Sequence, residues 1–286
     1  MNLTELIDTT KTSLDANGIW VTDVHFTPDT KASKEAWERI HDFSLEELRR
    51  QRDLFDQSKI QDHLKYLKED FDFTSETIYM EIGCGPSHIG DYLMGWYKTK
   101  FIGVDFNYRA LLILKKYFEE KGYKDYILIH ADIRNIPLKA NTVDFIFGGG
   151  VIEHMKETDI ALMESFRVLK NGGVSFNTVP AFNLFWLTKF WMNIPNVPVL
   201  RKWLEFVHMN VLKNRIFNKS YGYELSFTIS KLYNMHEKVG FKNIRAGSFA
   251  FHPSYEKVRS KILREFFYKV GEHESTCPFY FVSGVK

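Results

Sequence analysis

Two kinds of hydrophobic spacing divide the chain near residue 75. Before that point, apolar residues recur at helical intervals between long polar stretches. Ser44 and Glu47 have the spacing of a capping box, which is typical of the first turn of a helix. We therefore expect residues 1–75 to form an N-terminal helical cap.

From residue 76 onward, short apolar runs alternate with amphipathic stretches. The runs read IYMEI, FIGVD, YILIHAD, VDFIF and GVSFNTV, and segments of 3.6-residue periodicity separate them. Strands that alternate with helices of this length pair in parallel through right-handed crossovers. The pattern predicts an α/β fold over residues 76–286, with a three-layer, Rossmann-like sheet. The sheet is expected to be mostly parallel, with an antiparallel C-terminal strand at FYFVSGV.

An aromatic insertion interrupts this alternation at about residues 181–225. Its aromatic side chains recur at helical spacing, and other apolar residues cover the opposite side. Such a segment is either buried as a lid over the sheet or in contact with lipid. A membrane span needs roughly 18 consecutive apolar residues, and prolines and polar residues interrupt this segment before that length is reached. Two interpretations of residues 181–217 stay open: a substrate lid and a peripheral membrane contact.

The first chemical motif is the loop EIGCGPS, which follows the first strand. Glycines in such a loop let the backbone pass close to a ligand and leave the amides of the next helix free. A dinucleotide pyrophosphate requires a third glycine where this loop has Ser87, and Pro86 removes a donor. Glu81 would also repel a phosphate. The loop therefore suits a cationic ligand better than a dinucleotide.

Acidic residues end the next two strands. Asp105 lies 22 residues after Gly83, where a carboxylate can accept both hydroxyls of a ribose. Asp132 is placed to accept from an exocyclic amine, while Ile133 offers an apolar contact and a backbone N–H. Together these residues describe a slot for adenosine.

Five sequence blocks occur in the order and spacing of a known family: EIGCGPS, GVDFN, HADIRNIPL, VDFIFGGGVIEHM and FRVLKNGG. In these blocks the chain resembles class I S-adenosylmethionine-dependent methyltransferases, most of all the branch with the ubiquinone and menaquinone methyltransferases. The resemblance is close over residues 76–180. It implies S-adenosyl-L-methionine as the cofactor and S-adenosyl-L-homocysteine as the product. The cofactor-binding residues that it implies are Glu81, Gly83, Cys84, Gly85, Asp105, Phe106, Asp132, Ile133 and Gly149.

The implied reaction is an in-line displacement at the sulfonium methyl group. It needs positioning, exclusion of water, and a base where the acceptor loses a proton. His154 in VIEHM is the candidate catalytic base, because it follows the fourth strand and imidazole titrates in the useful range. The same residue suits a second role, in which it steadies the next helix beside Glu153.

Other candidate residues fall outside the five blocks. Trp186, Tyr221 and Tyr223 in the insertion are candidates for substrate binding. Asp23, His25 and Asp29 have the residue types of a metal site, but a turn before a helix explains them better. We therefore expect no bound metal.

Charge and composition exclude some classes of binding partner. The 286 residues carry a net charge of +2 without a basic block, so no nucleic-acid partner is expected. The chain has only two cysteines, and its first residues lack the pattern of a secretory signal, so we expect a cytoplasmic protein, with membrane association left open. The oligomeric state is not indicated.

The expected function is transfer of a methyl group to oxygen, nitrogen or carbon of a hydrophobic or aromatic small molecule, with lipid-linked acceptors included. The fourth strand is not followed by the Asn/Asp-Pro-Pro-aromatic signature, so adenine and glutamine acceptors are disfavoured. Two alternatives are a non-catalytic methyltransferase-like interaction module and a nucleotide-dependent oxidoreductase.

Overall fold

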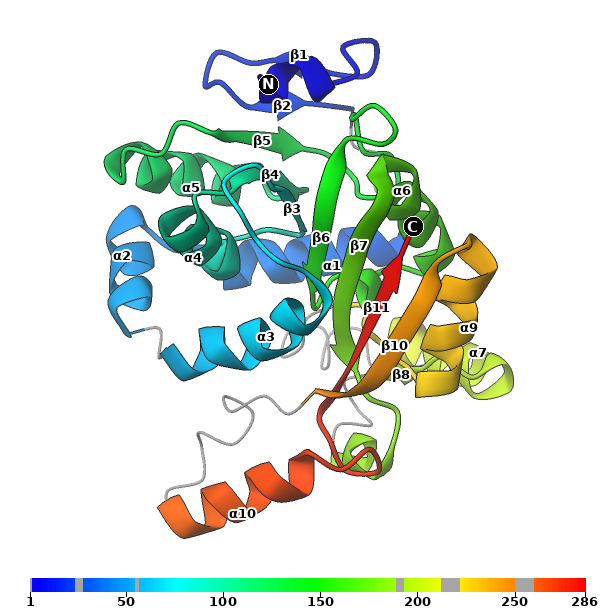
Figure 1. Cartoon of the computed structure of the whole chain (residues 1–286). Coiled ribbons are helices and arrows are strands. Elements are labelled where there is room, and N and C mark those ends of the chain that lie inside the picture. The colour runs from blue at the N-terminus through cyan, green and yellow to red at the C-terminus, as the bar shows by residue number, and fades with distance from the viewer. Residues whose placement is uncertain (1, 24–27, 55–56, 189–192, 212–221, 250–259) are drawn as a thin grey trace.

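A nine-stranded sheet forms the centre of the molecule in the computed structural model (Figure 1). The structure describes the whole chain except residues 1, 24–27, 55–56, 189–192, 212–221 and 250–259. The strand order is β1-β2-β5-β4-β3-β6-β7-β11-β10. The bounds are β1 Ser13–Leu14, β2 Trp20–Val21, β3 Ile78–Ile82, β4 Lys100–Asp105, β5 Tyr126–His130, β6 Val143–Gly149, β7 Leu169–Pro180, β10 Lys242–Phe249 and β11 Phe279–Val285.

The pairing confirms the predicted fold class. Neighbouring strands from β2 to β7 pair in parallel, whereas β11 pairs antiparallel with both β7 and β10. From β3 the chain builds outward through β4 and β5, then crosses back to place β6 on the other side of β3. That reversal creates a switch point between β3 and β6, at which the carboxyl ends of the strands diverge and ligands bind in such sheets.

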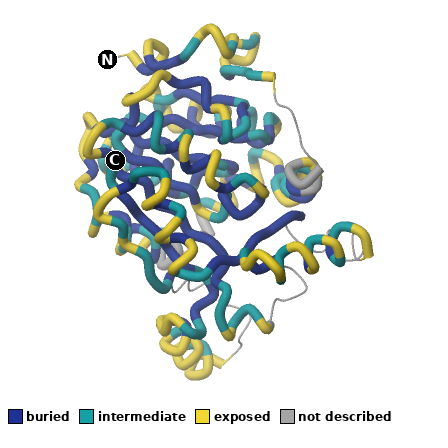
Figure 2. The backbone as a smooth tube through the Cα atoms, turned by 90° about the vertical axis from the view of Figure 1, so that its right-hand side faces the viewer, coloured by how far each residue is buried: buried dark blue, intermediate teal, exposed yellow. Residues whose placement is uncertain are grey.

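Each face of the sheet is covered by helices, because successive side chains of a strand point to opposite sides. Ile78 and Met80 belong to the core on the side of α6 and α9, whereas Tyr79 belongs to the core on the side of α3, α4 and α5. The strands are accordingly the buried centre of the molecule (Figure 2). The helices are α3 Gln57–Asp70, α4 His88–Tyr97, α5 Tyr108–Glu120, α6 Thr158–Val168 and α9 Ile229–Val239.

The N-terminal part contains the expected helices but also an unexpected hairpin. Helices α1 Pro28–Ile40 and α2 Leu45–Leu54 precede α3. The predicted capping box is present: the backbone N–H of Ser44 donates to Glu47 at 2.7 Å, and that of Glu47 donates to the Ser44 hydroxyl at 3.2 Å. In contrast, the first residues form the 3-10 helix η1 (Leu3–Leu6) and the β1–β2 hairpin, and β2 extends the sheet beside β5. Two-residue strands are too short to show a periodic pattern, so they could not be predicted from the spacing of apolar residues.

The insertion after β7 forms several short elements rather than one long helix. They are η3 Leu184–Thr188, β8 Ile194–Pro195, α7 Pro198–Phe206, the π-helix η4 Val207–Val211 and β9 Leu225–Ser226. In the sequence, Ile194 falls among the residues at helical spacing, but β8 and β9 pair in parallel, so Ile194 lies in a strand and is completely buried. Helix α10 (Lys261–Gly271) then precedes β11. Among the described helices, none has the length and apolar character needed to cross a bilayer.

Candidate active site

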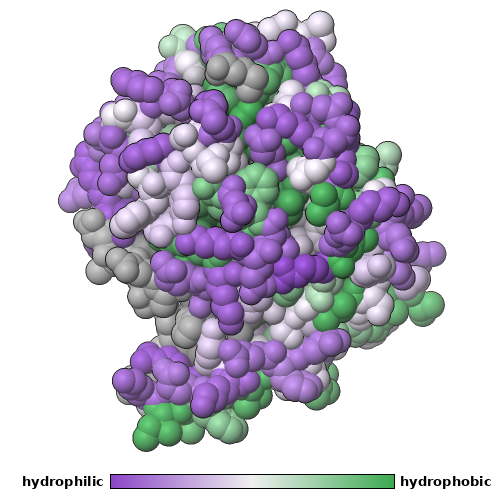
Figure 3. All heavy atoms as spheres, in the orientation of Figure 1, coloured by the Kyte–Doolittle hydropathy of each residue, from purple (hydrophilic) through white to green (hydrophobic). Residues whose placement is uncertain are grey.

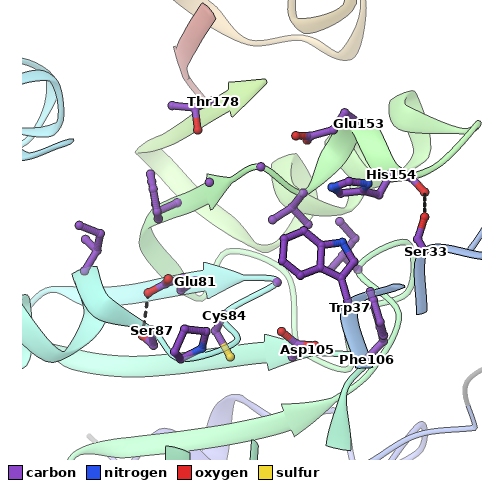
Figure 4. A pocket seen from close by; sticks show the side chains of 18 of the residues that line it. Ser33, Trp37, Glu81, Cys84, Ser87, Asp105, Phe106, Glu153, His154 and Thr178 are labelled. Carbon is purple, nitrogen blue, oxygen red and sulfur yellow. Dashed lines mark hydrogen bonds between the residues drawn. The ribbon is translucent and has the colours of Figure 1, made fainter. Parts of the chain in front are cut away.

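A pocket of about 450 Å³ opens at the carboxyl ends of the central strands. The elements β3, β4, β6 and β7 contribute Glu81, Asp105, Gly149 and Thr178, and helix α1 contributes Trp37 (Figure 4). Every predicted cofactor-binding residue except Gly85 lines this pocket, and Gly85 lies in the same loop. The pocket therefore unites residues that are spread over more than a hundred positions in the sequence.

The carboxylate of Glu81 is oriented by three donors that meet one oxygen. The hydroxyl of Ser87 donates to Oε2 at 2.8 Å, the hydroxyl of Tyr79 at 3.2 Å and the backbone N–H of Gly90 at 3.2 Å. Burial raises the pKa of Glu81 to about 7, despite these hydrogen bonds and the nearby charge of Arg52. A cationic group that neutralised this carboxylate would therefore be bound favourably.

The glycine loop needs its two glycines for steric reasons. Gly83 has φ +58°, and a Cβ atom there would lie 2.6 Å from Val151. Gly85 has φ +43°, and its Cβ would lie 2.6 Å from the His41 ring. Ser87 also takes the left-handed conformation, with φ +46°, but its hydroxyl binds Glu81 instead of capping α4. The cradle thus fits a ligand that approaches the backbone closely and offers a positive charge.

Asp105 ends β4 and ties the second strand to the glycine loop. Its carboxylate accepts the backbone N–H groups of Gly85 and Asn107, both at 2.7 Å. Burial raises its pKa to about 6, against the effect of these bonds. Carboxylate oxygens have further lone pairs, so Asp105 can accept ribose hydroxyls while it keeps both loop contacts.

Asp132 is less available than the sequence indicated. It lines the pocket, but its carboxylate accepts the guanidinium of Arg134 at 2.6 and 3.1 Å and the backbone N–H of the same residue at 2.8 Å. Arg134 in turn binds Glu157 at 2.9 Å. The neighbouring Ile133 is buried and lines the pocket as expected. The role of Asp132 toward adenine stays a prediction.

The remaining expected contacts form the walls. Cys84 and Phe106 line the pocket, and burial raises the pKa of the Cys84 thiol well above its usual range. Gly149 ends β6, where a Cβ atom would meet the Phe147 ring at 2.8 Å. These positions supply shape rather than charge.

His154 lies in the pocket wall on the short helix η2 (Ile152–His154). Its Nδ1 is 2.8 Å from the carbonyl oxygen of Tyr223, and its ring contacts that of Trp37 edge-on. A carbonyl only accepts, so Nδ1 carries the proton and Nε2 the lone pair. Burial lowers the pKa of His154 to about 4. The imidazole is therefore neutral near pH 7, which differs from the near-neutral titration that made it the candidate base.

Two of the three predicted substrate residues, Trp186 and Tyr223, lie in the described part of the chain. Trp186 in η3 is half-buried and donates its indole N–H to the carbonyl of Asn193 at 3.0 Å. Tyr223 is fully buried, and its hydroxyl contacts Arg201 at 3.1 Å and Glu205. Neither side chain is among the described residues that line the pocket. Tyr221 and His25 lie outside the described residues, as does the side chain of Asp29, and Asp23 is exposed.

Several residues that line the pocket or support its glycine loop were not found from the sequence. Trp37 and Ser33 come from α1, and the Ser33 hydroxyl donates to the carbonyls of His154 at 3.2 Å and Tyr223 at 3.3 Å. Arg52 from α2 is almost buried and holds the glycine loop through the carbonyl of Ser87 at 3.0 Å. Their positions depend on how the N-terminal helices pack, and no local motif marks them.

Comparison with known proteins agrees with the fold and with a methyltransferase domain. Residues 80–176 match the family described as "Methyltransferase domain". The chain is 28% identical to 2-methyl-6-phytyl-1,4-hydroquinone methyltransferase 2 of Oryza sativa, over 32% of the chain but only 28% of that protein. It is 24% identical to demethylmenaquinone methyltransferase of Staphylococcus aureus, over 80% of the chain and 96% of that protein.

Solved structures show the same fold. The Haemonchus contortus phosphoethanolamine N-methyltransferase 2, in complex with phosphomonomethylethanolamine and S-adenosylhomocysteine, superposes with a TM-score of 0.54 at 16% identity. The match covers 79% of this chain and 52% of that chain. Together, the domain match, the similar methyltransferases and the shared fold support a class I S-adenosylmethionine-dependent methyltransferase. The cofactor of this class is S-adenosylmethionine.

Proposed function

We propose that this protein transfers the methyl group of S-adenosylmethionine to a hydrophobic or aromatic small molecule. The observation that carries the proposal is the division of one pocket into two halves. Glu81 and Asp105 form a charged half that suits an ammonium group and a ribose. Trp37, Phe147 and Phe249 contribute aromatic side chains to the part of the pocket that is left for the acceptor, which we call the acceptor half.

The residues of the chain supply position and exclusion of water. S-adenosylmethionine, when bound, supplies the electrophilic methyl group. The carboxylate of Glu81 would bind the ammonium group, and Asp105 would accept the ribose hydroxyls while it keeps its hydrogen bond to the glycine loop. Both are buried, so the charged contacts are screened little by solvent. His154 presents a neutral imidazole to the acceptor half and can accept a hydrogen bond at Nε2.

The identity of the acceptor is the finer part of the proposal. The two similar proteins named above are, by name, a methylphytylhydroquinone methyltransferase and a demethylmenaquinone methyltransferase. A quinol or phenol with an apolar tail suits the aromatic side chains of the acceptor half. A lipid-linked acceptor is also such a molecule. The proposed function includes oxygen, nitrogen and carbon as accepting atoms.

We further propose that the insertion at 181–225 acts as a lid. Its residue Asn193 and the nearby Glu224 line the pocket, and Leu204 and Leu225 are buried in the core beside it. These contacts favour a lid over a membrane contact for the described part of the insertion.

Membrane contact is better supported at α10. Ile262, Leu263, Phe266, Phe267 and Val270 fall on one side of this helix and are all exposed. In Figure 3, apolar side chains gather on the outer edge of the molecule where α10 lies. Lys261 and Lys269 add positive charge on the polar side. An amphipathic helix of this kind binds an anionic membrane surface in its plane, where a lipid-linked acceptor would be found.

The test is a calorimetric titration with S-adenosylmethionine, S-adenosylhomocysteine and NAD, followed by a screen of quinols, phenols and polyprenyl lipids. We expect binding of the first two ligands only. Asp105→Ala should weaken their binding by roughly a hundredfold, because two hydrogen bonds to a carboxylate are lost. Asp105→Asn keeps one acceptor oxygen for the loop and serves as the control for folding.

Two results would overturn the proposal. Binding of NAD alone would indicate the oxidoreductase. Binding of neither sulfur ligand would indicate a non-catalytic module, and unchanged affinity in both Asp105 variants would remove the site assignment.

A further inference from the structure

Three buried ligand-type side chains meet in the acceptor half of the pocket. Glu153 and His154 lie on η2, and Glu224 precedes β9. One ligand atom from each lies within 4.8 Å of the others, and all three residues line the pocket. The hydrogen bond from His154 to the carbonyl of Tyr223 joins the two segments, which are about seventy positions apart.

Glu153 is the first sign that this cluster binds something. Its side chain is 1% exposed, and its Oε2 atom is buried without a hydrogen-bond partner in the described part of the chain. A buried carboxylate is costly unless it is paired with a cation or coordinates a metal. In Figure 4, the Glu153 side chain extends from η2 on the side of the pocket where His154 lies. An unsatisfied carboxylate beside a second carboxylate therefore indicates a cationic ligand.

His154 is arranged as metal-binding histidines usually are. Such residues donate one ring N–H to a carbonyl or carboxylate, which fixes the ring and leaves the other nitrogen as the ligand. Here Nδ1 donates to the Tyr223 carbonyl at 2.8 Å, and Nε2 holds the lone pair. The Ser33 hydroxyl fixes the backbone on both sides of this bond. The ring is thus oriented before any ligand arrives.

We propose that Glu153, His154 and Glu224 bind one divalent transition-metal ion. Two carboxylates with one imidazole suit Mn²⁺, Fe²⁺ or Zn²⁺ better than an all-oxygen site for Ca²⁺. Three protein ligands leave coordination positions open toward the pocket, as in catalytic metal sites. This proposal differs from the expectation of no bound metal. In the sequence, the residue types of a metal site were found only at residues 23–29, and Glu224 belongs to no motif.

The site would also decide the accepting atom, and that consequence rests on the proposed function. A metal ion lowers the pKa of a bound hydroxyl, so an acceptor with a phenolic or quinol oxygen is activated near neutral pH. That oxygen forms its bond to the methyl carbon while the carbon–sulfur bond breaks and sulfur keeps the electron pair. The hydroxyl proton leaves to water. Oxygen is therefore the accepting atom that this site selects.

The experiment is a titration of chelator-treated, full-length protein with Mn²⁺, measured by calorimetry and by the electron paramagnetic resonance signal of free Mn²⁺. We expect one ion per chain. Glu153→Gln and Glu224→Gln keep the side-chain shape and should each weaken binding by roughly tenfold or more. Glu237→Gln, an exposed glutamate on α9, is the matched control and should bind as the original protein does.

S-adenosylhomocysteine titrations and thermal unfolding of the same samples separate the outcomes. A variant that unfolds normally and binds S-adenosylhomocysteine but loses Mn²⁺ supports the metal site. Absence of Mn²⁺ binding in the original protein, or equal binding in both variants, overturns the metal site while leaving the proposed methyl transfer intact. Loss of S-adenosylhomocysteine binding by the original protein would instead contradict the proposed function.

Discussion

The carboxylate of Glu81 is held before any ligand reaches it. Ser87, Tyr79 and the backbone of Gly90 all donate to Oε2, so an ammonium group would reach the carboxylate through Oε1. The energetic consequence follows from burial, which raises the pKa of Glu81 to about 7. A group that is half protonated near neutral pH must lose a proton to bind a cation. Cofactor binding is therefore expected to depend on pH.

We predict that affinity for S-adenosylhomocysteine falls as the pH drops from about 7.5 to about 5.5. The ammonium group stays protonated over this range, but Glu81 becomes protonated below its pKa of about 7 and Asp105 below its pKa of about 6. Each protonated carboxyl costs about tenfold in affinity per pH unit below its pKa. Calorimetry at several pH values measures the profile.

Glu81→Gln tests whether Glu81 causes the pH dependence of binding. The amide cannot ionise, so the variant should bind more weakly near pH 7.5 but lose less affinity between pH 7 and pH 6 than the original protein does. A variant with the same steep profile would show that another group controls binding.

Residue identities at the loop were predictable only in part. The position of Glu81, Gly83 and Asp105 at the pocket could be inferred from the motif and from the strand ends, and their roles toward the cofactor stay predictions. Ser87 was noted as a departure from the usual glycine, but its bond to Glu81 depends on the path of the loop. The neutral state of His154 depends on burial, which no single residue reveals.

At the scale of elements, α10 presents its apolar side outward. Half-buried Arg264 and Tyr268 lie on the side turned toward the protein, whereas Phe266 and Phe267 are 58% and 43% exposed. We predict that the full-length protein sediments with vesicles that contain phosphatidylglycerol, and that Phe266→Ser with Phe267→Ser greatly reduces this binding. The reason is the loss of buried apolar area at the interface.

Trp96→Ser is the matched control for α10, because Trp96 is 75% exposed on a different helix. It should leave vesicle binding unchanged. If the double variant still binds vesicles but changes the oligomeric state in size-exclusion chromatography, α10 contacts a second copy of the chain and not a membrane.

Elements with strong local signals were predictable, and those made by tertiary contacts were not. Short apolar runs identified β3 to β7, and the capping box identified the start of α2. The insertion was expected to be helical, but the pairing of Ile194 with Leu225 gives a short parallel ladder instead. Such a pairing joins positions thirty apart, so helical spacing alone cannot exclude it. The division into a cap at 1–75 and a domain at 76–286 stays a prediction.

At the scale of the whole molecule, the N-terminal helices complete a pocket whose floor is the sheet. Trp37 on α1 packs on His154, and His41 lies against Gly85. Arg52 on α2 binds the carbonyl of Ser87 at 3.0 Å. Loop, sheet and N-terminal helices are therefore mechanically linked through the site. A ligand that orders the loop is expected to order α1 as well.

We predict that S-adenosylhomocysteine slows amide hydrogen exchange in α1 and in residues 83–90, and leaves exchange in α10 unchanged. The loop and α1 both contribute residues that line the pocket, whereas no residue of α10 does. Mass spectrometry of exchanged peptides measures the effect. Asp105→Ala, with the ligand at the same concentration, should show neither protection. If the loop is protected while α1 exchanges as before, the N-terminal helices do not respond to the cofactor, and the contacts of Trp37 and His41 serve packing alone.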